Sequence, residues 1–439
     1  MNKYPKYKPS GVEWIGEIPK HWNVMKLKNV INKIIDNRGR TPEYGSEGVP
    51  MLEIKQIDGV SKYPKSSFEK FVDPKLVNDF VRDPLKKGDV LIATVGATAG
   101  KSAIVERDPE YFIAQNLVGF RSNSSTAPEF LFYVSQSVYF REGLFAINKA
   151  NTIDNLKVSI FINNNCVVPP LEEQTVIANF LDDKTAQIDK LITNKQKLIE
   201  LLKEERTAVI NHAVTCGINP KVKLKESGIE WLGKIPKHWE MKKLKYIGKI
   251  VLGKMLTNDD KGDYNFKPYL RAANLQWLDA NIENVKEMWF SKMELEKLRI
   301  KEYDLLVSEG GEVGRTCIWR NELDECYIQN SVHKITIVEN QNPFFFLYQF
   351  FYLGSIGYFE SIVNRISIGH LTGEKIRELY IWSPNMDEQL QIVQQVETET
   401  KRIDGTISKI ENEIELLAEY RTALISEVVT GKIDVSNKV

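Results

Sequence analysis

The sequence predicts an α+β fold in which two mixed α/β modules are joined by two long helices that form an antiparallel coiled coil. Three observations predict it. A 19-residue motif occurs twice, each copy ends in a long stretch with helical apolar spacing, and short strand-like and helix-like segments precede each stretch. Together they indicate an internal duplication with a pseudo-twofold relation between its copies.

The duplication is clearest in one motif. Ser10–Lys28 (SGVEWIGEIPKHWNVMKLK) recurs 217 positions later as Ser227–Lys245 (SGIEWLGKIPKHWEMKKLK), with 13 of 19 positions identical. Later segments match in the same order, ending with Leu201–Thr215 against Leu416–Thr430, where 9 of 15 positions are identical. The copies agree at their ends and diverge in the middle. This pattern indicates a shared scaffold that carries two different globular surfaces.

The segments before the long stretches predict a mixed α/β module. DVLIATVG, KSAIVE and NCVVPP have the length and β-branched content of short strands. The apolar segments 128–145 and 342–359 each begin near a proline, which suits the first turn of a helix. Both are therefore expected to be helical.

A long helix is predicted at the end of each copy. Prolines precede both stretches, glycines follow them, and neither contains a proline. A seam with steps of three and four over five or more turns favours two helices of about 44 residues that pair with each other. The predicted seam residues are Ile177, Leu181, Ile188, Leu191, Leu198, Leu202 and Val209 in the first copy, and Ile392, Val396, Ile403, Ile407, Ile410, Ile414, Leu417, Leu424 and Val428 in the second.

These boundaries divide the chain into five parts. An antiparallel pairing of the helices would place the two modules at opposite ends of a rod. The parts are a first module at 1–170, a first helix at 171–217, a second module at 218–384, a second helix at 385–431 and a tail at 432–439.

Composition excludes several classes of protein. The 439 residues are 42% hydrophobic and 27% charged, with 59 basic and 59 acidic side chains, so the formal net charge is zero. Neutrality counts against a protein that wraps DNA unaided. Four cysteines without a CxxC pair argue against a disulfide framework or a zinc site. Without an apolar run of membrane-spanning length or a signal core, the chain is expected to be cytoplasmic.

Three segments resemble catalytic motifs, and each lacks an essential feature. Gly96–Ser102 has three residues between its glycines where a phosphate loop has four. Asp36, Glu53 and Lys55 mimic a metal-dependent nuclease, but the second copy replaces the last two with Arg271 and Ala273. Asn342–Phe345 lacks the second proline of an amino-methyltransferase motif. We therefore expect no catalytic site and no metal site in this chain.

The repeated PKHW motif is interpreted as structural. His21 and His238 are expected to fix local structure. Apolar residues surround the tryptophans of both copies, which favours core anchors over platforms for stacking bases. These are Trp14, Trp22, Trp231 and Trp239.

The duplicated GVEWIGEIPKHW, the GDVLI segment with its glycine turn and following Gln-Asn, and the PPLEEQ segment before the helix resemble the specificity subunits of type I restriction–modification systems, the HsdS family. The resemblance covers nearly the whole chain. It implies two target-recognition domains, each reading one half of a bipartite, asymmetric double-stranded DNA target. It also implies a coiled coil that sets the spacer and docks two modification subunits.

The resemblance places the chemistry in other subunits. The complex would be an adenine-N6 DNA methyltransferase and an ATP-dependent endonuclease. S-adenosylmethionine, ATP and Mg would be bound by HsdM-like modification and HsdR-like restriction subunits. This chain would hold no cofactor, would not be an enzyme and would have no membrane partner.

The candidate DNA contacts are chosen by residue type. Arg and Lys suit guanine and phosphate, whereas Asn and Gln suit adenine. A structural role is at least as plausible for any one of them, and is favoured for the two repeated Gln-Asn pairs. The candidates are Arg38, Arg40, Lys55, Gln56, Lys101, Gln115 and Asn116 in the first module, and Arg271, Asn274, Gln276, Arg315, Gln329 and Asn330 in the second.

Two alternative functions are considered. A coiled-coil scaffold whose duplicated modules bind protein partners agrees with the zero net charge. A self-contained nuclease or methyltransferase lacks the motifs it would need.

Overall fold

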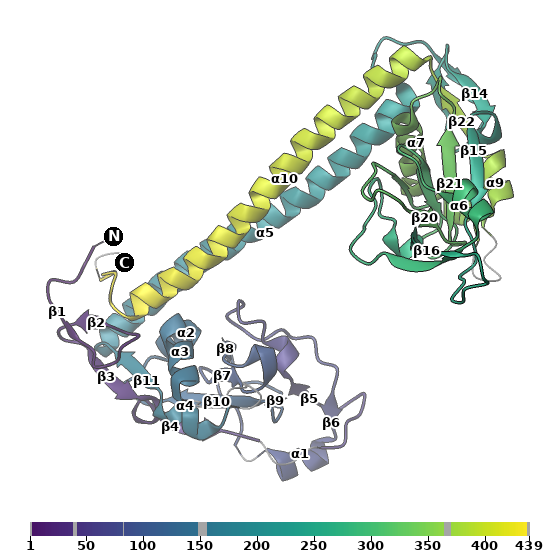
Figure 1. Cartoon of the computed structure of the whole chain (residues 1–439). Helices are drawn as coiled ribbons and strands as arrows, with labels where there is room; N and C mark the ends of the chain where they lie inside the picture. The colour runs from purple at the N-terminus through teal and green to yellow at the C-terminus, as the bar shows by residue number, and fades with distance from the viewer. Residues whose placement is uncertain (1, 38–41, 82, 148–155, 364–369, 437–439) are drawn as a thin grey trace. The chain divides into compact units, whose positions relative to one another are not determined.

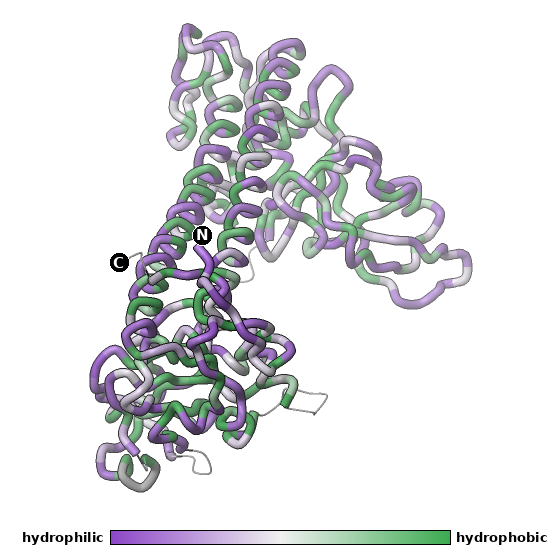
Figure 2. The backbone as a smooth tube through the Cα atoms, turned by 90° about the vertical axis from the view of Figure 1, so that its left-hand side faces the viewer, coloured by the Kyte–Doolittle hydropathy of each residue, from purple (hydrophilic) through white to green (hydrophobic). Residues whose placement is uncertain are grey.

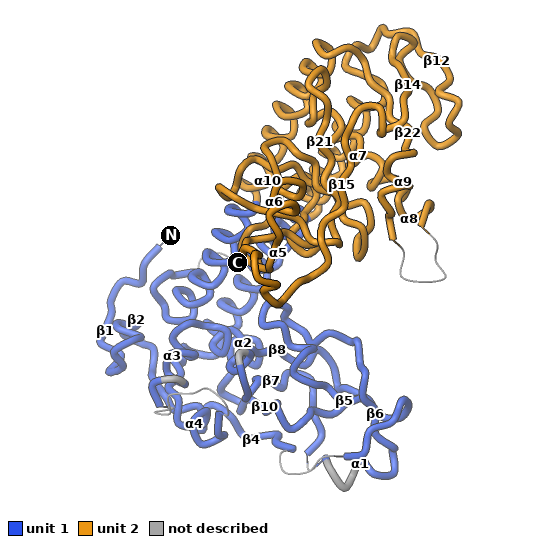
Figure 3. The backbone as a smooth tube through the Cα atoms, turned by 45° about the vertical axis from the view of Figure 1, so that its right-hand side comes forward, with its two compact units in different colours: residues 1–196, 411–439 blue, residues 197–410 orange. Residues whose placement is uncertain are grey.

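The chain divides into two compact units, each of which contains one globular module and parts of both long helices (Figures 1 and 3). Unit 1 consists of 1–196 and 411–439, and unit 2 consists of 197–410. The computed structural model describes residues 2–37, 42–81, 83–147, 156–363 and 370–436.

The described part of the unit 1 module is built on one four-stranded sheet and three smaller ones. The strand orders are β4-β10-β7-β8, β6-β5-β9, β1-β2 and β11-β3, and every pairing is antiparallel except that of β5 with β9. The strands are β1 (Tyr7–Pro9), β2 (Glu17–Pro19), β3 (Asn23–Lys26), β4 (Ile31–Ile35), β5 (Val49–Leu52), β6 (Phe71–Val72), β7 (Val90–Ala93), β8 (Ser102–Ile104), β9 (Phe112–Ile113), β10 (Leu117–Ser122) and β11 (Asn165–Val168). The helices are η1 (Leu27–Asn29), η2 (Ile54–Gln56), α1 (Pro74–Phe80), η3 (Gly96–Thr98), α2 (Pro128–Gln136), α3 (Val138–Ile147) and α4 (Val158–Asn163), where η denotes a 3-10 helix.

The unit 2 module repeats this arrangement strand for strand. Its orders are β15-β21-β18-β19, β17-β16-β20, β12-β13 and β14-β22, and β16 with β20 is again the parallel pair. The strands are β12 (Leu224–Glu226), β13 (Lys234–Pro236), β14 (Glu240–Lys243), β15 (Gly248–Leu252), β16 (Asn265–Leu270), β17 (Lys286–Phe290), β18 (Leu305–Ser308), β19 (Thr316–Ile318), β20 (Tyr327–Ile328), β21 (Val332–Ile337) and β22 (Tyr380–Ser383). The helices are η4 (Leu244–Tyr246), η5 (Ala272–Asn274), α6 (Lys292–Leu298), α7 (Pro343–Ser355), α8 (Tyr358–Ile362) and α9 (Gly373–Glu378). The duplication inferred from the motifs is confirmed.

Each predicted apolar helix is divided in two. Segment 128–145 becomes α2 and α3, because Ser137 is extended and its hydroxyl bonds the backbone on both sides, at Val134 O and Phe140 N. Segment 342–359 becomes α7 and α8, because Gly357 between them adopts a left-handed conformation with φ of 70°. The apolar pattern of the sequence predicts that both segments are helical. It does not predict where each helix is interrupted, because the interruptions depend on the Ser137 hydrogen bonds and on the Gly357 backbone angle.

The two long helices, α5 (Leu171–Cys216) and α10 (Met386–Val429), run antiparallel within each unit. In unit 1, Asp189 of α5 pairs with Arg421 of α10 at 2.9 Å, and Lys195 pairs with Glu413 at 2.5 Å. In unit 2, Arg206 pairs with Asp404 at 2.9 Å. Residue numbers that rise along α5 therefore meet numbers that fall along α10, which confirms the predicted antiparallel coiled coil.

The predicted seam is largely correct, with two exceptions. Most of its residues are buried, and Figure 2 shows hydrophobic residues recurring among hydrophilic ones along both helices. Leu191 and Leu198, however, are 43% and 44% exposed, whereas Ile199 is buried. A strict step of seven drifts around an α-helix of 3.6 residues per turn, so the buried face shifts by one residue there.

Each module also buries the end of the other copy's helix. Leu424, Val428 and Val429 of α10 lie in the same core cluster as Trp22 of unit 1. In unit 2, Ile210 and Val214 of α5 lie in one cluster with Trp239. Burying one such aliphatic side chain contributes roughly 1.5–3 kcal/mol. The long helices are therefore part of both cores.

Candidate functional site

A carboxylate in the first turn of each long helix binds the repeated PKHW motif. Glu173 of α5 accepts hydrogen bonds from Trp22 Nε1 at 3.0 Å and from the Tyr4 hydroxyl at 2.5 Å, and His21 Nε2 lies 2.9 Å from the same carboxylate. Burial and the adjacent Glu173 raise the pKa of Tyr4 well above its ordinary value, so the phenol stays protonated. This carboxylate joins the start of the helix to the N-terminal segment.

Unit 2 repeats the contact with one partner fewer. Glu388 of α10 accepts from Trp239 Nε1 at 3.1 Å and lies 2.7 Å from His238 Nε2. Trp22 and Trp239 are both 0% exposed. The prediction that these histidines and tryptophans are structural is confirmed. Sequence reasoning missed the two glutamates, although their repeated Glu-Gln pair was a usable signal.

Three segments that carry candidate residues meet where strands β5, β7 and β9 of unit 1 end. We call the surface that they form the unit 1 edge. The glycine turn leaves β7 and returns through Lys101, whose carbonyl accepts from Ala93 N at 2.8 Å. The carbonyl of Asn116 accepts from Thr94 N at 3.0 Å, directly after β7. Because β5 and β9 are parallel, Leu52 lies opposite Ile113, so η2 and the Gln115–Asn116 turn leave the sheet at the same edge.

The same three segments meet in unit 2, where they are bonded directly. Arg315 donates to the Ala272 carbonyl of η5 at 3.0 Å, and Ala272 N donates to the Ser331 hydroxyl at 3.0 Å. Leu270 lies opposite Ile328 in the parallel pair. Residues that are more than 40 positions apart in sequence therefore form one surface in each module.

Two of the candidates are buried and bonded within this edge. Gln56 is 2% exposed, and its side chain accepts from Glu53 N at 2.9 Å and donates to the Ser67 carbonyl at 2.7 Å. Asn274, its counterpart, is 3% exposed and bonds Arg271 N in the same way at 3.2 Å. Both amides cap a 3-10 helix, so neither is available to a ligand in this conformation.

Lys55 is exposed but already paired. Its ammonium contacts Glu69 and also Glu53, at 3.3 Å. Burial alone would raise the pKa of Glu53, but hydrogen bonds from Lys70 and Lys55 lower it below the ordinary value. Glu53 thus remains a carboxylate that neutralises two lysines.

The cation that follows the glycine turn differs between the units. Among the described residues, Lys101 is exposed and has no polar partner for its ammonium group. Arg315, its counterpart, pairs with Glu312 at 2.9 Å, and its side chain is only 18% exposed. Glu312 also accepts from Trp277 Nε1 at 2.5 Å. The unit 1 edge therefore offers a free cation where the unit 2 edge offers a neutralised one.

The other candidates lie on the same edges. Gln115, Asn116 and Gln276 are exposed. Gln329 and Asn330 are half-buried, and the Gln329 side chain accepts from Ser331 N at 3.3 Å. Arg38 and Arg40 lie outside the described residues.

An open cleft of about 480 Å³ lies in the unit 1 module. It is lined by aromatic residues and by both signs of charge, so no single charged group is favoured. The lining residues include Tyr63, Lys65, Phe68, Arg107, Asp108 and Tyr111. Among the described residues, no group of three or more His, Cys, Asp or Glu side chains is arranged to hold a metal ion, and no helix is long and apolar enough to cross a membrane.

Comparison with known proteins finds one family, matched twice. Residues 19–201 and 236–416 each match the family model described as "Type I restriction modification DNA specificity domain". The chain is 26% identical to the putative type I restriction enzyme MjaX specificity subunit of Methanocaldococcus jannaschii, over 96% of both chains. It is 22% identical to the type I restriction enzyme EcoKI specificity subunit of Escherichia coli, over 66% of this chain and 62% of that protein.

Solved structures share the fold. The HsdS subunit from Thermoanaerobacter tengcongensis matches with a TM-score of 0.58 at 17% identity, over 95% of this chain and 98% of that one. A chain from a study of complex assembly and conformational transition in a type I R-M system matches with a TM-score of 0.72 at 16% identity, over 95% and 99%.

Proposed function

Because the chain belongs to the family of type I restriction modification DNA specificity domains, we propose that it is the subunit that selects the DNA target of a type I restriction–modification complex. The observation that carries this function is the coincidence of two family matches with two equivalent modules in one chain. Each module would read one half of a bipartite target. As a specificity subunit, the chain itself has no catalytic role.

The assignment of parts follows from the duplication. Residues 1–170 and 218–384 are the two target-recognition domains, 171–217 and 385–431 are the helices that set the spacer, and 432–439 is a tail. The helices dock two HsdM-like modification subunits, and HsdR-like restriction subunits complete the assembly. Those partners hold S-adenosylmethionine, ATP and Mg.

The edge formed by the three segments is the proposed DNA surface in each domain. The exposed candidates supply donors and acceptors that suit base edges and phosphates. They are Lys101, Gln115 and Asn116 in the first domain and Gln276 in the second, with Lys55 and Arg315 able to contribute if DNA displaces their carboxylates. This surface is stabilised from inside each domain, by Gln56 in the first and by Asn274 and Arg271 in the second.

A domain exchange tests the division of labour. Replacing residues 30–165 with those of another specificity subunit should change one half of the methylated target and leave the other half and the spacer unchanged. Long-read sequencing of methylated DNA from a host that carries the complete operon measures both halves together. A simultaneous change in both halves would contradict the proposal.

An insertion tests the helices as a spacer. Seven residues added to each helix, after Gln196 in α5 and after Ile410 in α10, keep the heptad phase of the antiparallel pair. At 1.5 Å per residue the pair lengthens by about 10 Å, or about three base pairs of DNA. The methylated target should gain a longer spacer between unchanged halves, and an unchanged spacer would refute this role.

Zero net charge favours one other function, a scaffold whose two modules bind proteins. A gel-shift assay with and without the modification subunits separates the two. DNA binding by the complex supports the specificity role. A complex that assembles normally but never retains DNA favours the scaffold.

A further inference from the structure

We propose that Arg421 is a positioning residue for the first recognition domain, although it belongs to the helix of the second copy. It holds the loop of residues 58–62 against the long helices, and that loop supports Lys101 at the DNA-facing edge. The inference rests on the proposed function for its consequence on DNA, but the hold on the loop stands on contacts within unit 1.

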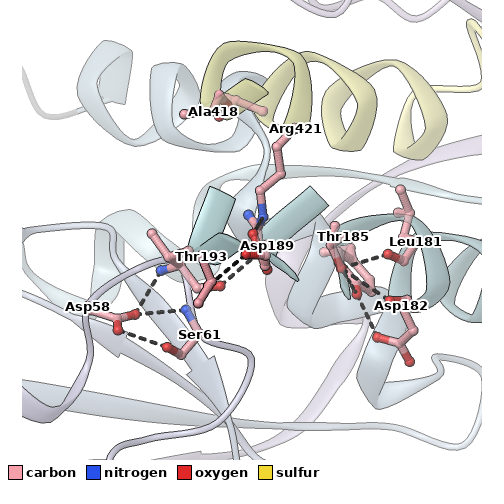
Figure 4. Close-up of polar contacts among 12 residues, drawn as sticks. Asp58, Ser61, Leu181, Asp182, Thr185, Asp189, Thr193, Ala418 and Arg421 are labelled. Atoms are coloured by element: carbon pink, nitrogen blue, oxygen red, sulfur yellow. Dashed lines mark hydrogen bonds and ion pairs between the residues drawn. The ribbon is translucent and has the colours of Figure 1, made fainter. Parts of the chain in front are cut away.

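Arg421 connects both long helices to the loop (Figure 4). Its Nε donates to Asp189 Oδ1 of α5 at 2.9 Å, and its Nη2 donates to the Val60 carbonyl at 2.8 Å. The residue is 8% exposed although it carries a full charge. A buried guanidinium with both an ionic and a backbone acceptor is strongly restrained.

The loop is built to present that carbonyl. Asp58 accepts from Val60 N at 2.9 Å and from Ser61 N at 2.8 Å, and its other oxygen accepts from the Ser61 hydroxyl at 2.8 Å. Gly59 has a φ of 80°, which a residue with a side chain rarely adopts. The loop therefore has one well-defined shape.

The loop packs directly on Lys101. A Cβ atom at Gly59 would lie 2.9 Å from Lys101 Cγ and 3.1 Å from its Cδ, so the aliphatic stem of the lysine rests against the glycine. A displacement of the loop would therefore displace the lysine. The contacts run without a gap from Arg421 through Val60 and Gly59 to Lys101.

A second link ties the end of the same loop to α5. The Lys62 ammonium lies 2.6 Å from both oxygens of Asp182, which also accepts from the Tyr133 hydroxyl at 2.6 Å. The carbonyl of Lys62 accepts from Ile104 N at 2.9 Å, extending the sheet beyond β8. The loop thus lies between the helices and the edge strand and is bonded to both.

Unit 2 provides a matched control. Arg206 occupies the equivalent place in the repeated Arg-Thr-Ala segment and pairs with Asp404 at 2.9 Å. Its side chain is 26% exposed, and no bond from it to the unit 2 module is found among the described residues. Each arginine forms its own interhelical ion pair with an aspartate. Among the described residues, Arg421 also binds a loop of its module and Arg206 does not.

The test compares Arg421→Gln with Arg206→Gln in the full complex with its modification subunits. Hydrogen exchange of residues 58–65 measures the hold on the loop. Methylation of DNA with single-base changes in either half-site measures recognition. We expect Arg421→Gln to raise exchange in 58–65 and to lower methylation about tenfold or more, with discrimination weakened in the first half-site alone. Arg206→Gln should change neither readout.

A second variant acts on the same contacts without touching the helices. Gly59→Ala places a methyl group against the Lys101 stem and should reproduce the loss of first-half discrimination. Equal behaviour of Arg421→Gln and Arg206→Gln in either readout would overturn the inference, as would normal discrimination in Gly59→Ala. If the wild-type complex methylated no DNA, the proposed function would fail, and exchange in 58–65 would still decide whether Arg421 holds the loop.

Discussion

Both modules form an equivalent backbone hydrogen bond, but the residue that accepts it carries a different side chain in each module. Ile104 N donates to the Lys62 carbonyl in unit 1, and Ile318 N donates to the Leu278 carbonyl in unit 2. Lys62 then forms an ion pair with Asp182, whereas Leu278 is buried in the core of its unit. At this position the duplicated scaffold keeps the backbone contact, and the two copies differ in the side-chain contacts around it.

The carboxylates at the starts of the long helices keep their tryptophan and histidine contacts in both copies, differ in the Tyr4 contact, and allow the largest test. Glu173→Ala leaves the buried Trp22 indole and the Tyr4 hydroxyl without their acceptor, so we expect a loss of about 4 kcal/mol in unfolding free energy. Glu388→Ala should cost about half of that, because among the described residues the buried donor to Glu388 is Trp239 alone, and its other partner, His238, is exposed. Urea denaturation measures both. Equal losses would show that Tyr4 contributes nothing.

The glycines that follow the two long helices differ in how closely neighbouring atoms would approach an added Cβ. Gly431 and Gly217 have φ values of 72° and 75°, which costs an alanine roughly 1 kcal/mol at either place. A Cβ at Gly431 would lie 2.4 Å from Pro19, whereas the nearest atom to one at Gly217 is 3.4 Å away, in Trp239. We expect Gly431→Ala to destabilise by about 3 kcal/mol and Gly217→Ala by about 1 kcal/mol. Thermal unfolding of both variants tests the ranking, and a reversed order would contradict it.

The cations after the glycine turns should differ in their effect on DNA binding. Lys101→Gln removes a free charge, so the salt dependence of binding should weaken by about one counterion. Arg315→Gln should change it less, because Glu312 already neutralises that arginine. Glu312→Gln should strengthen binding by releasing Arg315. Binding isotherms at several salt concentrations measure all three, and identical slopes for the two cation variants would refute the distinction.

The smallest effect concerns pH and the loop of residues 58–62. Burial opposes ionisation of Asp58, but bonds from Ser61 and Val60 lower its pKa to about 2 from an ordinary value of 3.8. Its contribution to loop stability is therefore fully present above about pH 4 and is lost as the pH falls through 2. The matching segment of unit 2 is closed by a backbone bridge between Leu275 and Ala280. Asp58→Asn should lower amide protection at 58–61 at neutral pH, and unaltered protection would contradict this role.

Much of the fold could be predicted from the sequence because it repeats. The antiparallel helix pair, the α+β modules and the structural role of Trp22 and Trp239 followed from motif order and apolar spacing. The exposure of Leu191 and Leu198 did not, since the buried face shifts by a single residue that an idealised seven-residue step conceals. The strand pairings that build the edge are between distant segments, which local pattern does not specify.

The candidate site was harder to predict, since residue type does not reveal burial. Gln56 and Asn274 have the side chains of adenine readers, yet both cap 3-10 helices beneath the surface. Arg421 is distant in sequence from the residues that it contacts. Its partners Asp189 and Val60 come from a neighbouring helix and from a loop more than 350 positions away.

The composition of unit 1 has a consequence for how the protein is made. Its core contains Leu424 and Val428 of α10, and Asn2 is bonded to Asp434, so residues of the first copy find partners that come after the second module in the chain. The whole second copy must be translated in between. Of the two units, the one begun first is thus completed last, and a chain that stopped before Leu424 would contain a finished unit 2 and an unfinished unit 1.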